Sequence, residues 1–167
     1  MAVLDIITIG HETLKKHADD VTNITDEIIE LARSMTETMH AAPGIGLAAP
    51  QVNKSVRLIV VDLSVGESKK DLIVLVNPEI VESEGEDTAL EGCLSVPDVQ
   101  EKITRPFKAA VRGTDLDGKE RFFEADDLLA RVFCHEIDHL EGKLFVDHLS
   151  HLKKSLIRKK LKKQHPL

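Results

Sequence analysis

The sequence predicts one α+β domain in which helices pack against a largely antiparallel sheet. A helical pattern precedes several β-branched segments, and two further helical patterns follow them. The alternation is too irregular for a doubly wound fold. The 167 residues suffice for one domain with a sizeable core and are too few for two ordinary domains. In this arrangement a helix with an H-E-x-x-H motif is central, and another helix ends the chain.

A first helix is expected from about Thr25 to His40. Its apolar residues recur on one helical face, at Ile28, Ala32, Met35 and Met39. Asn23 or Thr25 can cap its start, because their side chains can accept a hydrogen bond from an unpaired backbone N–H. Pro43 and Gly44 end it.

Several strands are expected in the middle of the chain. The segment GIGLAAPQV (44–52) is apolar, but its glycines and proline fit neither regular element well. Two segments rich in β-branched residues then predict strands, VRLIVVDL (56–63) and LIVLVNPEIV (72–81). Two more, at 109–116 and 121–125, flank the dipeptide Asp117-Gly118, which is typical of a hairpin turn.

Two helices are expected in the last third of the chain. One runs from about Asp126 to Glu141, with acids near its start and Gly142 as its stop. Ser150 can cap the other, a basic helix of roughly a dozen residues. We therefore divide the chain into a catalytic part, 1–150, and a basic helical tail of the same domain, 151–167.

Charge is unevenly distributed along the chain. The net charge is −7, yet all 29 acids and only 15 of the 22 cations lie before residue 151. An acidic body with a basic tail predicts a local contact with an anionic partner and argues against specific DNA binding. A tail that is simply solvated is the alternative.

Composition also excludes several classes of protein. No apolar run reaches the roughly 18 residues that a membrane span needs. The N-terminal segment has acids at Asp5 and Glu12 and no basic start, so a signal peptide is not expected. Cys93 and Cys134 are the only cysteines, which argues against a disulfide framework and favours a reducing compartment such as the cytoplasm.

The motif HEIDH (135–139) predicts a metal site. His135 and His139 stand four residues apart in the expected helix, so both imidazoles lie on one face and can bind one ion. Glu136 lies about 100° round the helix and can act as a base on a bound water. Two histidines do not complete a site, so a third ligand is required.

The residues alone leave the third ligand open. Cys134 points away from the face that the histidines share, and we interpret it as a small buried residue. Phe145 stands where one metalloprotease pattern needs a histidine, Glu141 is too close to serve as a downstream ligand, and Asp147 is conceivable. Cys93, in LEGCLSVP, could complete a Cys-His-His set with an open fourth position. The alternative for Cys93 is a buried structural thiol.

Three segments in order, GIGLAAPQ (44–51), EGCLS (91–95) and HEIDH (135–139), together resemble the signature motifs of the peptide deformylase family. The resemblance covers nearly the whole chain, and the basic C-terminus is similar to that of the type I bacterial branch. It implies a cytoplasmic hydrolase that removes the N-formyl group from the initiator methionine of new proteins and releases formate. It also implies one divalent metal ion, natively Fe²⁺, which Ni²⁺, Co²⁺ or Zn²⁺ can replace.

The resemblance further implies roles for matching residues. Cys93, His135 and His139 would be the metal ligands, and Glu136 the general base and acid. The amide of Gln51 and the backbone N–H of Leu94 would bind the oxyanion.

Other matching residues would bind the substrate or support the site. Ile45 and Gly46 would present backbone groups to an extended substrate, as an added strand does. The methionine pocket would be lined by Ile45, Leu128 and Val132, although plain core packing is the alternative for these three. Glu91 and Arg105 would pair to support the site.

The implied partners are formyl-methionyl nascent peptides and, through the basic C-terminal helix, the ribosome. The loop expected at 98–104 lacks the basic residue that many relatives carry there. Two other classes remain as alternatives. A zinc endopeptidase would need a third ligand of another kind, and a non-catalytic metal module would have a closed four-ligand site without need of Glu136 or Gln51.

Overall fold

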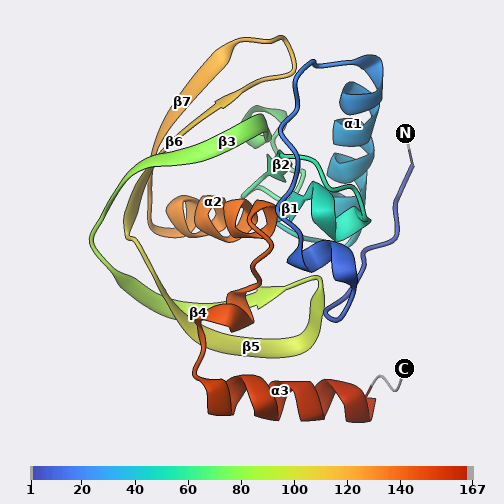
Figure 1. Cartoon of the computed structure of the whole chain (residues 1–167). Helices are drawn as coiled ribbons and strands as arrows, with labels where there is room; N and C mark the ends of the chain where they lie inside the picture. The colour runs from blue at the N-terminus through green and yellow to red at the C-terminus, as the bar shows by residue number, and fades with distance from the viewer. Residues whose placement is uncertain (1, 165–167) are drawn as a thin grey trace.

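The structure is a computed structural model that describes residues 2–164 (Figure 1). The last three residues of the predicted tail, 165–167, lie outside the described residues. The helices are α1 (Asp26–Ala41), α2 (Asp127–Leu140) and α3 (His151–Gln164). The described residues also contain four short 3₁₀ helices, η1 (Glu12–Lys15), η2 (Ala49–Val52), η3 (Lys69–Asp71) and η4 (Phe145–His148).

Seven strands complete the architecture: β1 (Gly46–Ala48), β2 (Leu58–Val61), β3 (Ile73–Glu84), β4 (Asp87–Cys93), β5 (Val96–Arg105), β6 (Lys108–Thr114) and β7 (Glu120–Asp126). Five of them form an antiparallel sheet in the order β1-β2-β3-β6-β7, and β4 and β5 form a separate antiparallel hairpin. The predicted α+β fold with antiparallel strands is therefore confirmed. The H-E-x-x-H helix, α2, lies between the sheet and the hairpin, and α3 lies beyond the hairpin (Figure 1).

Helix α1 begins at the expected cap. The Thr25 side chain accepts a hydrogen bond from the backbone N–H of Ile28, which satisfies one of the donors left over at a helix start. The buried residues Ala32, Met35 and Met39 pack on strands β1 and β2. The helix ends before Pro43, as predicted.

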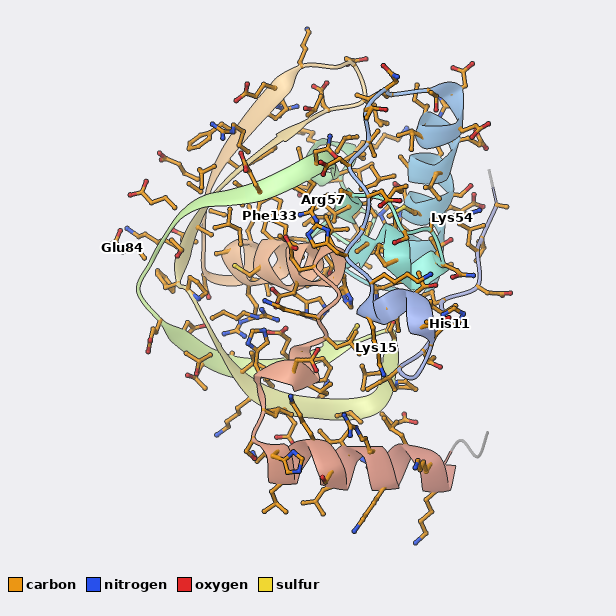
Figure 2. All side chains as sticks on the ribbon, in the orientation of Figure 1. His11, Lys15, Lys54, Arg57, Glu84 and Phe133 are labelled. Carbon is orange, nitrogen blue, oxygen red and sulfur yellow. The ribbon has the colours of Figure 1, made fainter. Side chains whose placement is uncertain are left out.

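Helix α2 is buried on almost every side because strands cover it from two directions. Phe133 and Leu140 are fully buried and pack with Leu75 and Val111 of the five-stranded sheet. Figure 2 shows Phe133 inside the molecule and Glu84, from the far end of β3, pointing outward. Gly142 follows the helix with φ +77°, a left-handed conformation that favours glycine.

The middle of the chain differs from the expectation in three places. Within the segment 44–52, residues 46–52 form the short strand β1 and the 3₁₀ turn η2. Strand β3 continues to Glu84 because its second half pairs with β6. The stretch 98–104, expected to be a loop, belongs to strand β5 and pairs with β4. Asp98 has φ +62°, which interrupts the alternation of inward and outward side chains by which a strand is recognised.

Helix α3 is anchored beneath β5. Ser150 caps it as predicted, since its hydroxyl accepts a hydrogen bond from the Lys153 backbone N–H at 3.2 Å. Ile157 and Leu161 are buried in a cluster with Val99 and Ile103 of β5. None of the helices in the described part of the chain is long and apolar enough to cross a membrane.

The end of α2 supplies a stability prediction. A Cβ at position 142 would lie 2.5 Å from the backbone oxygen of Lys15, whereas a Cβ at Gly118, φ +82°, would meet nothing within 4 Å. Gly118→Ala should cost about 1–2 kcal/mol for the left-handed backbone alone. Gly142→Ala should cost about 1–3 kcal/mol more, because the backbone must shift. Urea unfolding of both variants measures the difference, and equal losses would contradict the close packing.

Candidate metal centre

Three metal-binding side chains converge between α2 and the β4–β5 hairpin. The candidate donor atoms of Cys93, His135 and His139 all lie within 4.8 Å of one another. Cys93 Sγ is 3.4 Å from His139 Nε2, which in turn is 3.2 Å from His135 Nε2. Cys93 ends β4, where a register shift precedes the turn into β5. The turn therefore carries the thiol across the face of α2 that holds both histidines.

The donor set fits a divalent transition metal. One thiolate and two neutral imidazoles suit several borderline ions, and three protein ligands leave a position for water or substrate. His139 is almost completely buried. Burial and the neighbouring His135 hold the pKa of His139 well below its usual range, so its imidazole is neutral and keeps a lone pair for a metal.

The other ligands considered from the sequence lie elsewhere. Cys134 is buried on another face of α2, and burial raises its pKa to about 11. Phe145 stacks on the ring of His135, with ring centroids 6.3 Å apart. An Asp147 carboxylate oxygen accepts a hydrogen bond from the Leu144 backbone N–H at the start of η4.

Glu136 shares the site and lies against β1. A Cβ at Gly46 would stand only 2.5 Å from Glu136 Oε2 and 2.9 Å from Val132 Cγ1, so glycine makes room for the carboxylate. Glu136 is buried, and its Oε1 has no hydrogen-bond partner within the described residues. Burial raises the pKa of Glu136 to about 7. This carboxyl group can both take up and release a proton near neutral pH.

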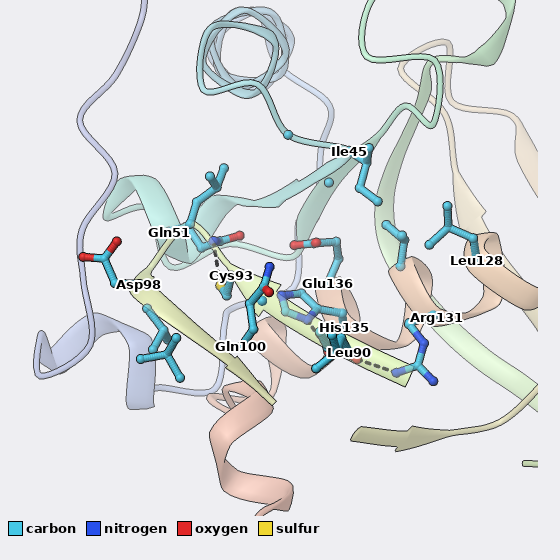
Figure 3. A pocket seen from close by; sticks show the side chains of 18 of the residues that line it. Ile45, Gln51, Leu90, Cys93, Asp98, Gln100, Leu128, Arg131, His135 and Glu136 are labelled. Carbon is cyan, nitrogen blue, oxygen red and sulfur yellow. Dashed lines mark hydrogen bonds and ion pairs between the residues drawn. The ribbon is translucent and has the colours of Figure 1, made fainter. Parts of the chain in front are cut away.

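Gln51 is held with its amide directed at the cysteine. Its Oε1 accepts a hydrogen bond from the Ala48 backbone N–H at 2.9 Å, which fixes the orientation of the side chain. Its Nε2 then donates to Ser95 Oγ at 3.1 Å and to Cys93 Sγ at 3.5 Å. Figure 3 shows Gln51 and Glu136 pointing toward each other across the pocket. Leu94 follows Cys93 in the turn and lines the same pocket.

A buried carboxylate supports His135. Glu91 Oε1 lies 2.5 Å from His135 Nδ1, and its two oxygens accept hydrogen bonds from Arg105 at 2.6 and 3.2 Å. Burial opposes ionisation of Glu91, but the bonds with His135 and Arg105 hold its pKa well below its usual range. Because His135 donates through Nδ1, its Nε2 is left to face the metal donors.

Sequence reasoning missed two members of this support. Arg131 donates to Glu91 Oε2 at 2.8 Å, and Asp138 accepts from Arg105 at 2.6 Å. Arg131 stands one helical turn before His135, and Asp138 stands three residues after it, so all three share a helical face. Both are charged residues on the face of α2 that carries His135, and a charge at such a position in a largely apolar helix is the signal that could have identified them.

A cavity of about 820 Å³ opens beside the metal donors. Its apolar wall contains Ile45 and Val132, and Leu128 stands half-exposed at the rim. Gly46 belongs to β1, the edge strand of the five-stranded sheet. The volume suits a ligand with several groups beyond one side chain.

Comparisons with known proteins agree on one family. A family model described as polypeptide deformylase matches residues 3–155. Peptide deformylase 2 of Nitrosomonas europaea is 51% identical over 164 residues, which cover 98% of this chain and 88% of that protein. The crystal structure of a peptide deformylase from Legionella pneumophila has a TM-score of 0.92 and 44% identity, covering 98% of this chain and 95% of that one. A peptide deformylase from Ehrlichia chaffeensis in complex with actinonin also has a TM-score of 0.92, with 35% identity and all of both chains covered.

Substitutions of the two cysteines distinguish the loss of a metal ligand from a general loss of structure. Cys93→Ala should abolish stoichiometric metal binding, because it removes one of three donors. Cys134→Ala should keep the metal, since Cys134 is buried away from the donor set. Metal content after anaerobic purification, measured with circular dichroism on both variants, checks this. A folded Cys93→Ala protein with full metal content would exclude the cysteine ligand.

Proposed function

Since the chain belongs to the peptide deformylase family, we propose that the Cys93, His135 and His139 cluster is the metal centre of its catalytic site. The enzyme is a metal-dependent hydrolase that removes the N-formyl group from the N-terminal formyl-methionine of newly synthesised proteins and releases formate. The observation that carries the site assignment is the buried Glu136 carboxylate in the cavity that Cys93 and His135, two of the three metal donors, also line.

Cys93, His135 and His139 would hold a divalent ion, which would supply a Lewis acid and lower the pKa of a bound water. We assign the proton transfers to Glu136. It takes a proton from the water as the water oxygen attacks the formyl carbon. It then returns that proton to the amine nitrogen as the C–N bond breaks, so a free amine and formic acid leave, and the formic acid loses its remaining proton to give formate.

Negative charge that develops on the formyl oxygen needs hydrogen-bond donors. We assign this task to the Gln51 amide and the Leu94 backbone N–H. The bond from Ala48 N–H to Gln51 Oε1 keeps the donating end of the amide turned into the site. Such a preorganised donor requires no rearrangement during the reaction, and its removal typically costs about 10²–10³ in rate.

We propose that Fe²⁺ is the native ion and that Ni²⁺, Co²⁺ or Zn²⁺ can replace it. A single thiolate with two imidazoles accepts all of these ions. Glu91 and Arg105 then act as supports that hold His135 in one tautomer, and they do not themselves contact substrate.

The substrate is assigned to the cavity as an extended peptide. The unbranched side chain of methionine would enter among Ile45, Leu128 and Val132, which line the apolar wall. The peptide backbone would lie against Ile45 and Gly46, because β1 is the edge of its sheet and can accept an added strand.

Residues 1–150 contain the metal donors and the residues assigned to the reaction, and 151–167 form the basic tail of the same domain. We assign the protein to the bacterial cytoplasm and its tail to ribosome docking. One face of α3 carries the exposed side chains Leu152, Leu156, Lys159 and Lys163. A cationic and apolar face of this kind suits a surface of nucleic acid and protein.

Glu136→Ala tests the mechanism. The variant should still bind one metal ion, because the three ligands remain, and its kcat on a formyl-methionyl peptide should fall by about 10²–10⁴. Formate release and metal content are measured on the same preparation. Glu124→Ala, a change on exposed strand β7, serves as control and should keep its rate. Ordinary turnover by a metal-loaded Glu136→Ala protein would exclude Glu136 as the proton carrier.

Ribosome docking is tested by charge removal, because truncation of α3 would also expose the cluster that Ile157 and Leu161 cover. Lys159→Gln/Lys163→Gln should reduce co-sedimentation with ribosomes at low salt by weakening contacts with phosphate. The matched change Lys69→Gln/Lys70→Gln removes two exposed cations from η3 and should have little effect. Equal loss in both double variants would indicate attraction by net charge alone.

A further inference from the structure

Helix α3 contributes a side chain to the wall of the cavity. Lys160 lines it together with Asp98 and Gln100 of β5, and Figure 3 shows these two β5 residues on the side of the pocket away from Leu128. The Lys160 ammonium donates a hydrogen bond to the main-chain oxygen of Asp98 at 3.1 Å. The tail, which composition describes only as basic, therefore reaches the cavity that the metal donors Cys93 and His135 line.

The position of Lys160 is fixed by its neighbours on the helix. Ile157, one turn before it, and Leu161, the next residue, are buried beneath β5. Two turns before it, Lys153 pairs with Glu101 of the same strand at 3.3 Å. These residues share the side of α3 that faces β5, so the helix holds Lys160 at the edge of the cavity.

The charge of Lys160 remains available for a ligand. An ammonium group has three N–H donors, and the contact with Asp98 uses one of them on a neutral carbonyl oxygen. The other lining cation, Arg131, is committed, because it forms ion pairs with Glu91 and Asp87. Lys160 is also exposed, so a bound peptide can reach it without crossing packed atoms.

The position of Asp98, which Lys160 contacts, relative to the metal donors indicates which substrate residue Lys160 can bind. Val96 pairs with Cys93 and Gln100 with Gly92, and Asp98 lies on the bulged stretch between them, so the α-carbons of Asp98 and Cys93 lie within about 12 Å of each other. An extended peptide advances about 3.3 Å per residue. A chain whose formyl group lies at the metal donors and which extends toward Asp98 therefore reaches it by its third or fourth residue.

We propose that Lys160 is a specificity residue that binds an acidic side chain at the third or fourth position of the formyl-methionyl substrate. The inference rests on the proposed function, since it places the formyl group at the metal centre. It gives α3 a part in substrate choice that is separate from any role of its outer face.

The test compares two amidated peptides, formyl-Met-Ala-Glu-Glu and formyl-Met-Ala-Gln-Gln, which differ only in charge. The acidic body of the protein repels the first peptide in every variant, so the informative quantity is the ratio of their kcat/KM values. Lys160→Gln should lower the acidic-to-neutral ratio about two- to fivefold at low salt, as expected for one exposed ion pair. The change should appear mainly in KM for the acidic peptide and should shrink as salt is added.

Two further variants complete the experiment. Lys160→Glu should lower the ratio further, because attraction becomes repulsion. Lys162→Gln removes the same charge from the opposite side of α3 and should leave the ratio as in the wild type. An equal ratio in the wild type and Lys160→Gln, or an equal drop in Lys162→Gln, would overturn the inference. Failure of the metal-loaded wild type to hydrolyse either peptide would instead overturn the proposed function.

Discussion

The site depends on the hydrogen bonds that the buried carboxylate of Glu91 accepts. A carboxylate taken out of water costs several kcal/mol unless charged and hydrogen-bonding partners surround it. Glu91 comes from β4, and its partners Arg105, Arg131 and His135 come from β5 and α2. The same carboxylate therefore ties the β4–β5 hairpin to the helix and fixes the tautomer of a metal-binding histidine. Because Cys93 stands two residues after Glu91, this tie also sets the distance between the thiol and the two imidazoles.

A second constraint acts from the opposite side of α2. Gly46 lets β1 approach the helix until a Cβ would overlap the Glu136 carboxylate. The same stretch of chain continues into η2, where Gln51 is oriented by the Ala48 backbone. The residue types of this stretch thus allow β1 to lie close to α2 and hold Gln51 in place, and they contribute less to regular strand pairing. The cavity lies between the two constraints, with the metal donors on one side and the edge of the five-stranded sheet on the other.

Local signals predicted much of the fold and part of the site. The cap at Thr25, the turn at Asp117-Gly118 and the spacing of His135 and His139 each depend on neighbours in sequence, so propensity and periodicity suffice. The β4–β5 hairpin was not predicted, because Asp98 breaks the strand alternation and because the inward residues of β5 become buried only when α3 packs on them. The supporting role of Arg131 was not predicted for a similar reason, since its partner Glu91 lies 40 residues away in the sequence. Cys93 could be proposed from residue chemistry, but its proximity to α2 arises only from the folded hairpin.

The C-terminal helix shows why charge composition alone gives an incomplete account of a basic segment. Its inner side buries Ile157 and Leu161 and holds Lys160 beside the cavity. Its outer face exposes Leu152, Lys159 and Lys163. Deletion of the helix would remove core packing, a lining cation and the outer charges together, so a loss of activity could not be assigned to any one of them. Substitutions that change charge on one face at a time leave the buried anchors intact, and they alone separate catalytic specificity from docking.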